Sequence, residues 1–202
     1  MEISFIIDNA DRIGIVSFAI SGVAVGVRKK MDLYGLLILG LVTAVGGGIL
    51  RDVVIDDVPR IFLMRDYLIL AVLSSCLVIG SEWIRWRIPN IVMHIADAVG
   101  TGSFAVTGAL IAWEKGLAWP AGIILAVLTA TGGGVIRDVL AARIPQVLRS
   151  ELNATGAAFG GVAILLIADS SIEFATIVGF SITTVISILG HVGWIQIPQL
   201  KR

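Results

Sequence analysis

The chain has 202 residues, of which 57% are apolar and 15% are charged, and its formal net charge is zero. Soluble domains are about 45–50% apolar and about 25% charged, so this composition excludes an ordinary soluble domain. The balanced charge gives no reason to expect a nucleic acid as a partner. The mean hydropathy of +0.97 indicates a polytopic membrane protein.

Seven apolar segments follow one another, separated by short charged stretches. Because backbone groups in lipid must be satisfied within the protein, each segment is expected to be a helix, and the fold class is all-α. The period-2 alternation of a membrane barrel is not found. The expected spans are 13–27, 33–55, 67–84, 95–113, 119–141, 152–168 and 172–194.

The single cysteine, Cys76, lies in an apolar stretch. One cysteine cannot form an intramolecular disulfide and does not make a metal cluster. We therefore expect Cys76 to be a small buried apolar residue. We also expect no metal site and no resident cofactor.

An odd number of spans places the two termini on opposite sides of the membrane. Lys and Arg beside the spans favour the cytoplasmic side. The side of the C-terminus carries nine of them, and the side of the N-terminus carries four: Arg28, Lys29, Lys30, Arg85, Arg87, Arg143, Arg149, Lys201 and Arg202 against Arg12, Arg60, Arg65 and Lys115. We expect a cell (inner) membrane protein with its N-terminus outside and its C-terminus in the cytoplasm.

The sequence contains an internal repeat. The stretch TATGGGVIRDVL at 129–140 matches TAVGGGILRDVV at 43–54, at an offset of 86 residues. Held without gaps, this offset gives 18 identities in the 49 positions from 11 to 59. Many of these identities are Gly, Asp, Arg or Pro, which indicates a duplication and not a coincidence of composition.

Each copy of the repeat holds three spans, so the second copy must enter the membrane in the opposite sense. We expect repeat one at about 10–87, repeat two at about 96–170 and a seventh helix at about 172–194, all within one transmembrane domain, 1–202. Inverted repeats typically place the transport pathway at their interface and use interrupted helices there.

A glycine triplet lies on the middle helix of each repeat. Glycine costs about 1 kcal/mol relative to alanine at each helix position, so three in a row weaken a helix. We expect each middle helix to be kinked at its triplet beside the pathway; the alternative is that small residues only permit tight helix packing. The six glycines are Gly46, Gly47, Gly48, Gly132, Gly133 and Gly134.

Arg51 and Arg137 follow these triplets. A helical side chain leans toward the N-terminus of its helix, so Arg51 is expected to lie across Gly47 and Arg137 across Gly133. Charges inside spans are costly and usually functional. The alternative is that each arginine lies near a helix end and its long side chain carries the guanidinium to the membrane surface.

Aspartates recur at matching positions and are candidate partners for these arginines. Neighbouring residues on a helix point about 100° apart, which favours a partner on another helix over the adjacent aspartate. Paired arginines would no longer repel cations; a gate or a structural brace are the other possible roles. The adjacent aspartates are Asp52 and Asp138, and those on other helices are Asp11 and Asp97.

Hydroxyl residues within the spans are candidates for lining a polar pathway, although each hydroxyl could instead bond to a carbonyl of its own helix. They are Ser17, Ser21, Thr43, Ser103, Thr107, Thr129 and Thr131. Lys29 and Lys115 also occupy matching positions, either at the pathway or as exposed interfacial cations.

Two three-helix repeats, each with GGGxxRD on its middle helix, and a seventh helix resemble the bacterial branch of the trimeric intracellular cation (TRIC) channels. The resemblance covers essentially the whole chain. It implies a homotrimer with a potassium-type monovalent cation pathway in each protomer. Members of this branch have also been labelled glycine transporters, so a secondary transporter of a small solute such as glycine is the alternative function.

No enzyme signature accompanies these features. The sequence has no dinucleotide-binding fingerprint, no P-loop and no nucleophile–histidine pairing, so we expect no enzymatic activity. A channel needs a continuous polar path, whereas a transporter needs a closed site near the midplane. The motif arginines are expected near the two ends of the pathway, which favours a channel.

Overall fold

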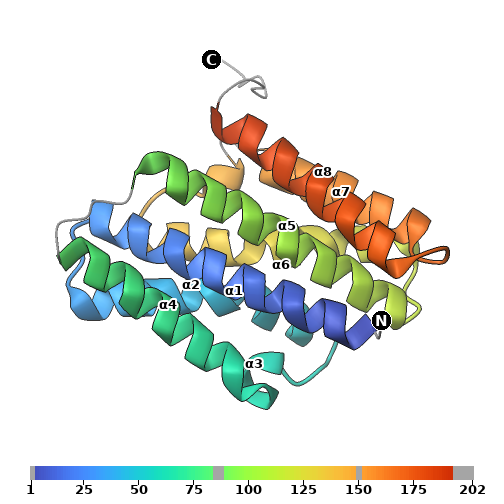
Figure 1. Ribbon diagram of the computed structural model, residues 1–202, viewed down its shortest axis with the longest axis horizontal. Helices are drawn as coiled ribbons and strands as arrows, with labels where there is room; N and C mark the ends of the chain where they lie inside the picture. Colours follow the sequence, from blue (N-terminus) through green and yellow to red (C-terminus); the bar gives the residue numbers. More distant parts are fainter. Residues whose placement is uncertain (1–2, 84–88, 149–151, 193–202) are drawn as a thin grey trace.

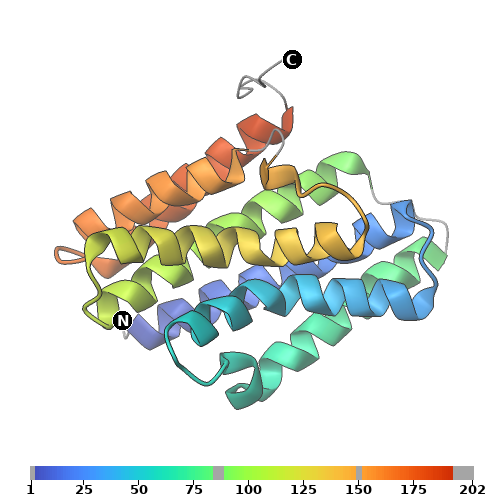
Figure 2. The same cartoon turned by 180° about the vertical axis from the view of Figure 1, so that it is seen from behind.

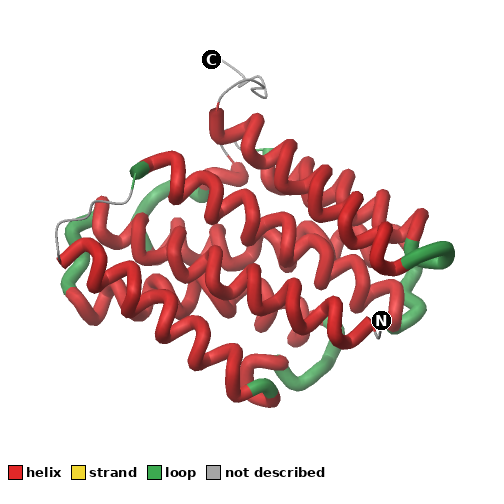
Figure 3. Tube along the Cα trace, in the orientation of Figure 1, coloured by secondary structure: helices red, strands yellow, loops and turns green. Residues whose placement is uncertain are grey.

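The computed structural model describes residues 3–83, 89–148 and 152–192. Throughout these residues the chain consists of helices joined by short loops (Figure 3). The elements are α1 (Ile3–Arg28), α2 (Leu33–Val54), α3 (Arg60–Leu63), α4 (Arg65–Trp83), α5 (Asn90–Glu114), α6 (Trp119–Leu140), the 3₁₀ turn η1 (Gln146–Leu148), α7 (Asn153–Ile167) and α8 (Ile172–Val192).

One long helix corresponds to each of the seven expected segments. Five of these, α1, α2, α5, α6 and α8, are long and apolar enough to cross a membrane, while α4 and the 15-residue α7 complete the set. The ends assigned to repeat one at 87 and to the seventh helix at 194 fall outside the described residues. Cys76 is exposed on α4, so the expectation of a buried cysteine is wrong.

The helices α1 and α5 start earlier than hydropathy suggests. In α1 the residues ahead of the expected span include the charged Asp8 and Arg12, which are paired with other side chains. Asp8 bonds to Arg60, and Arg12 bonds to Asp66. Tertiary pairing therefore accommodates the charged residues of the longer α1.

The two repeats pack against each other through equivalent helices. The first helices, α1 and α5, lie side by side, and the middle helices, α2 and α6, lie side by side behind them (Figures 1 and 2). α4 lies along one flank, and α7 with α8 along the other. α5 is the most buried of the five long apolar helices, because it contacts α1, α6, α7 and α8.

The middle helices continue through their glycine triplets. α2 and α6 are each a single α-helix over their whole length, without a break in the helix at the triplet. A Cβ on Gly47 would overlap the carbonyl oxygen of Thr129, and a Cβ on Gly133 would overlap that of Thr43. The triplets thus let α2 and α6 approach closely, which was the alternative interpretation.

Both middle helices also end in the same way. Residues at matching repeat positions, Asp56 and Ala142, adopt left-handed φ values of 59° and 48°. The following amide bonds back to the helix, from Asp57 to the Asp52 carbonyl at 2.8 Å and from Arg143 to the Asp138 carbonyl at 3.0 Å. This reversal brings the next segment, α3 or η1, back over the aspartate of the motif.

Candidate functional site

Arg51 lies at the centre of a buried cluster between α1, α2 and α5. Its side chain is 1% exposed. Nη1 donates to Asp11 Oδ1 and to Thr107 Oγ1, both at 2.9 Å, and Nε donates to Asp52 Oδ1 at 2.8 Å. The guanidinium is thus held by two carboxylates and one hydroxyl, an arrangement that satisfies a buried charge.

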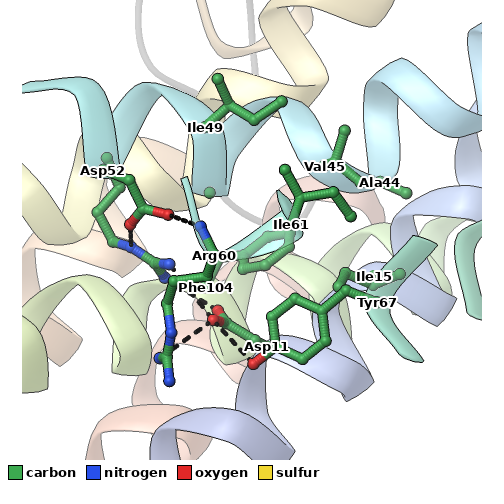
Figure 4. Close-up of a pocket in the computed structure, with 12 residues that line it drawn as sticks. Asp11, Ile15, Ala44, Val45, Ile49, Asp52, Arg60, Ile61, Tyr67 and Phe104 are labelled. Atoms are coloured by element: carbon green, nitrogen blue, oxygen red, sulfur yellow. Dashed lines mark hydrogen bonds and ion pairs between the residues drawn. The ribbon is translucent and has the colours of Figure 1, made fainter. Parts of the chain in front are cut away.

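Arg60 and Tyr67 complete this first cluster. The backbone amide of Arg60 donates to Asp52 Oδ2 at 2.8 Å, and its guanidinium lies 3.6 Å from Asp11 Oδ2. The Tyr67 hydroxyl lies 3.4 Å from Asp11 Oδ2. Figure 4 shows the Asp11 carboxylate between Arg60 and the Tyr67 hydroxyl.

Arg137 occupies the equivalent position in the second repeat, with its side chain 3% exposed. Its Nε donates to Asp138 Oδ1 at 2.8 Å, and its Nη1 pairs with Asp97 Oδ1. Nη1 also bonds to Ser21 Oγ at 2.5 Å, and this hydroxyl donates to Asp97 at 2.8 Å. The second arginine is therefore also held by two carboxylates and one hydroxyl.

Further polar groups surround the second cluster. Asp97 Oδ2 accepts from Asn153 Nδ2 at 3.2 Å and lies 3.6 Å from His191 Nε2. Asp138 accepts from Arg143 Nη2 at 2.7 Å and from the amide of Gln146 at 2.9 Å. His191 comes from α8, which has no counterpart in the other repeat, so this contact makes the two clusters different.

The two clusters exchange one hydroxyl each. Thr107 belongs to repeat two but binds Arg51, whereas Ser21 belongs to repeat one but binds Arg137. Ser21 and Thr107 are themselves separated by the repeat offset of 86 residues. The exchange therefore follows a pseudo-two-fold axis that relates the halves.

A small pocket adjoins each arginine, and the two pockets are built from matching positions. Every residue that lines the first pocket has its partner at the repeat offset in the lining of the second. The first pocket, of about 20 Å³, is lined by Asp11, Ile15, Ala44, Val45, Gly48, Ile49, Arg51, Asp52, Arg60, Ile61, Tyr67 and Phe104. The second, of about 10 Å³, is lined by Phe18, Asp97, Thr101, Ala130, Thr131, Gly134, Val135, Arg137, Asp138, Gln146, Val147 and Asn153.

Similar proteins match this chain over most of their length. A family model described as glycine transporter matches residues 9–82 and 94–169. A membrane protein of Deinococcus radiodurans is 37% identical over 93% of this chain and 89% of its own. The membrane protein YvgT of Bacillus subtilis is 40% identical over 75% of this chain and 76% of its own, and the inner membrane protein YadS of Escherichia coli is 40% identical over 75% and 74%.

Solved structures match the whole fold. One TRIC cation channel is 36% identical, with a TM-score of 0.86 over 96% of this chain and 97% of its own. A TRIC trimeric intracellular cation channel orthologue from Rhodobacter sphaeroides is 31% identical, with a TM-score of 0.84 over 94% and 98%. The chain belongs to the TRIC family. Its place among polytopic membrane proteins follows from the same likeness.

The expected pairing of the arginines is present in this TRIC family member, with one addition. Asp11 and Asp97 bind Arg51 and Arg137 from another helix, as the repeat predicts, but the adjacent aspartates bind them too. This is possible because each guanidinium presents several donors, so Nε faces its neighbour while Nη1 reaches across. Extension to the membrane surface is wrong for both arginines, because both are buried within the protomer.

The glycine beneath each arginine is not the expected one. A Cβ on Gly48 would lie 3.8 Å from Arg51 Nη2, and one on Gly134 would lie 3.6 Å from Arg137 Nη2. Gly47 and Gly133 instead face the opposite middle helix. Each arginine therefore lies over the glycine three positions earlier in its helix and not over the one four positions earlier.

The remaining candidates divide between the clusters and the helix contacts. Ser21 and Thr107 lie in the clusters. The hydroxyls of Thr43, Thr129 and Thr131 bond to carbonyls of their own helices, as the alternative interpretation held.

Four other candidates lie away from the arginines. Ser17 is buried on α1, and Ser103 lines an apolar pocket between α1, α5 and α8. Lys29 is exposed at the end of α1, and Lys115 pairs with the exposed Asp57 at 2.8 Å. Both lysines thus lie outside the two buried clusters.

The sequence interpretation missed Arg60, Tyr67, Arg143, Asn153 and His191. The first four occupy loops or helix starts, where polar residues are ordinary. A signal existed in the repeat offset, since it pairs Tyr67 with Asn153, and both contact the equivalent aspartate. Identity between the halves does not reveal such a pair, because the two residues differ.

Proposed function

We propose that this chain assembles as a homotrimer in which each protomer conducts monovalent cations, potassium among them, through the region of the two arginine clusters. The observation that carries the proposal is the pair of equivalent pockets beside the buried arginines, which the pseudo-two-fold axis relates to each other. Inverted repeats place a pathway at such an axis. The TRIC cation channels among the solved relatives support the same function.

The charge balance of the clusters fits a path for cations. Two carboxylates surround Arg51 and two surround Arg137, and one carboxylate of each pair also binds a second arginine, Arg60 or Arg143. Each group of two arginines and two aspartates is therefore formally neutral. A lone arginine would repel a passing cation, whereas these groups do not carry excess positive charge. Pairing thus answers the difficulty that a buried arginine poses for a cation channel.

The sizes of the pockets favour a channel over a carrier of glycine. A space of about 20 Å³ holds about one water molecule, and the two pockets of about 20 and 10 Å³ do not exceed this size. A carrier would be expected to enclose a substrate-sized site between its repeats. Small pockets of the size of a water molecule are instead what a narrow ion path requires.

We assign roles to the candidate residues on this basis. The arginines and aspartates line and close the path. Ser21 and Thr107 each bind the arginine of the other repeat and so link the two halves of the path. The glycine triplets set the distance between α2 and α6. Potassium or sodium are the permeant ions, no resident cofactor takes part, and lipid surrounds the trimer.

We propose that the chain lies in the cell (inner) membrane with its N-terminus outside and its C-terminus in the cytoplasm. The excess of Lys and Arg beside the spans on the C-terminal side supports this orientation. The first pocket then faces the outside and the second faces the cytoplasm.

Liposomes containing the purified protein test conduction directly. Under an imposed potassium gradient we expect a rapid electrogenic potassium flux that needs no co-substrate. Saturable glycine uptake without potassium flux would contradict the proposal and support the carrier. Mass measurement of the protein in a mild detergent tests the trimer, and a monomer that conducts would refute that part alone.

A further inference from the structure

Two phenylalanines lie between the two pockets. Phe18 on α1 and Phe104 on α5 stack edge to face, with ring centroids 5.2 Å apart and an interplanar angle of 65°. Both side chains are 1% exposed. They occupy matching positions of the repeat, so the pseudo-two-fold axis relates one ring to the other.

Each ring forms part of the wall of the opposite half's pocket. Phe104, from repeat two, lines the pocket of Arg51 (Figure 4), and Phe18, from repeat one, lines the pocket of Arg137. Because the two rings also contact each other, the same pair of side chains borders both pockets. A direct line from one pocket to the other therefore meets these rings.

We propose that the Phe18–Phe104 pair is the constriction between the two pockets and limits how fast cations cross the protomer. This inference rests on the proposed conduction and adds the residues that restrict it. A phenyl ring cannot replace the water that a cation must shed. Apolar constrictions of this kind close pores by excluding water.

Three glycines leave the space that the two phenyl rings occupy. A Cβ on Gly14 would lie 2.8 Å from Phe104 Cε1, and a Cβ on Gly100 would overlap the ring of Phe18. A Cβ on Gly133 would also lie 3.1 Å from Phe18. The rings thus fill space that three glycines leave open, so removing the rings opens a gap in line with both pockets.

The test compares potassium flux in liposomes for Phe18→Ala, Phe104→Ala and the double variant. We expect the double variant to raise the flux at least about tenfold, because the apolar barrier is gone. Phe104→Leu keeps an apolar side chain of intermediate size, so its increase in flux should be smaller than that of Phe104→Ala. The matched control is Leu110→Ala, a fully buried residue on α5 that lines neither pocket, and it should leave the flux unchanged.

The outcomes separate this inference from the proposed function. Wild-type flux with no increase in a folded double variant overturns the constriction and leaves conduction intact. An equal increase in Leu110→Ala overturns it too, because the effect would then be general loosening of the core. Absence of potassium flux from the wild type and the double variant alike refutes conduction, and the constriction with it.

A second measurement tests the constriction if the alanine variants do not fold. In a Cys76→Ser background, which removes the chain's one cysteine, Phe104→Cys is exposed to silver ions. We expect silver to reach this thiol and block the flux, and to leave Leu110→Cys and the parent protein unaffected. Equal block of Leu110→Cys, or no block of Phe104→Cys, would overturn the proposal.

Discussion

A buried arginine is stabilised here by geometry that one aspartate could not supply. Arg51 directs different guanidinium nitrogens to Asp11 and Asp52 and a further bond to Thr107. Breaking a buried ion pair leaves an uncompensated charge, which costs more than the pair contributes. Each aspartate of the clusters is therefore essential to the fold as well as to the proposed path.

Replacement of Asp97 by alanine should strongly destabilise the protein. The change leaves Arg137 buried with one carboxylate in place of two, and we expect the free energy of unfolding to fall by about 3–5 kcal/mol. Denaturant titration in mixed micelles, followed by circular dichroism, measures it. The control is Asp66→Ala, whose ion pair with Arg12 joins side chains that are 45% and 35% exposed; there a loss of at most about 1 kcal/mol is expected. Equal losses would contradict the argument.

At the scale of the residue, the sequence predicted the contacts of side chains that are identical in the two repeats. Asp11 and Asp97 are identical at matching positions, and the pairing with Arg51 and Arg137 follows. Tyr67 and Asn153 do the same task with different side chains, so no identity marks them. Contacts made across the fold by unlike residues lie beyond what one sequence pattern can reveal.

At the scale of the element, the glycine triplets illustrate how helix propensity and packing compete. Three consecutive glycines weaken a helix in water, which predicts a break. In the protein, α2 and α6 gain close contact at these positions and stay helical. The number and order of the seven long helices could be predicted from hydropathy, but this competition could not, because it depends on which helix lies opposite.

Two glycine-to-alanine changes should have opposite effects. In Gly47→Ala the added Cβ meets the backbone of α6, which cannot move aside, so we expect a loss of about 1–3 kcal/mol. Gly80, inside α4, has no neighbouring atom within 4 Å of such a Cβ. Gly80→Ala should therefore raise stability by about 0.5–1 kcal/mol through helix propensity. Thermal unfolding in detergent measures both, and a loss in Gly80→Ala as large as in Gly47→Ala would refute the packing argument.

At the scale of the whole molecule, the fold is two copies of one unit that cannot complete its own site. The arginine of each half takes a hydroxyl from the other half, and each pocket takes a phenyl ring from it. The inverted arrangement could be predicted from three spans per copy. The exchange could not, because an offset between sequences does not say which side chains cross the axis.

Splitting the chain between the repeats tests this interdependence. Residues 1–87 and 88–202, produced separately, should each fail to give a monodisperse membrane protein, because each lacks the hydroxyl and ring from its partner. Produced together, with an affinity tag on one piece, they should co-purify and regain potassium flux. A stable, monodisperse 1–87 fragment would show that the first half completes itself.

The exchanged hydroxyls also restrict how the two copies could diverge after duplication. Other matching positions have diverged further: Asp57 corresponds to Arg143, and Tyr67 corresponds to Asn153. Ser21 and Thr107 differ by a methyl group and keep the oxygen that the opposite arginine needs. Because the hydroxyl at either position binds the arginine of the other copy, a substitution in one half alters the site of the other, and the two halves are constrained together at these positions.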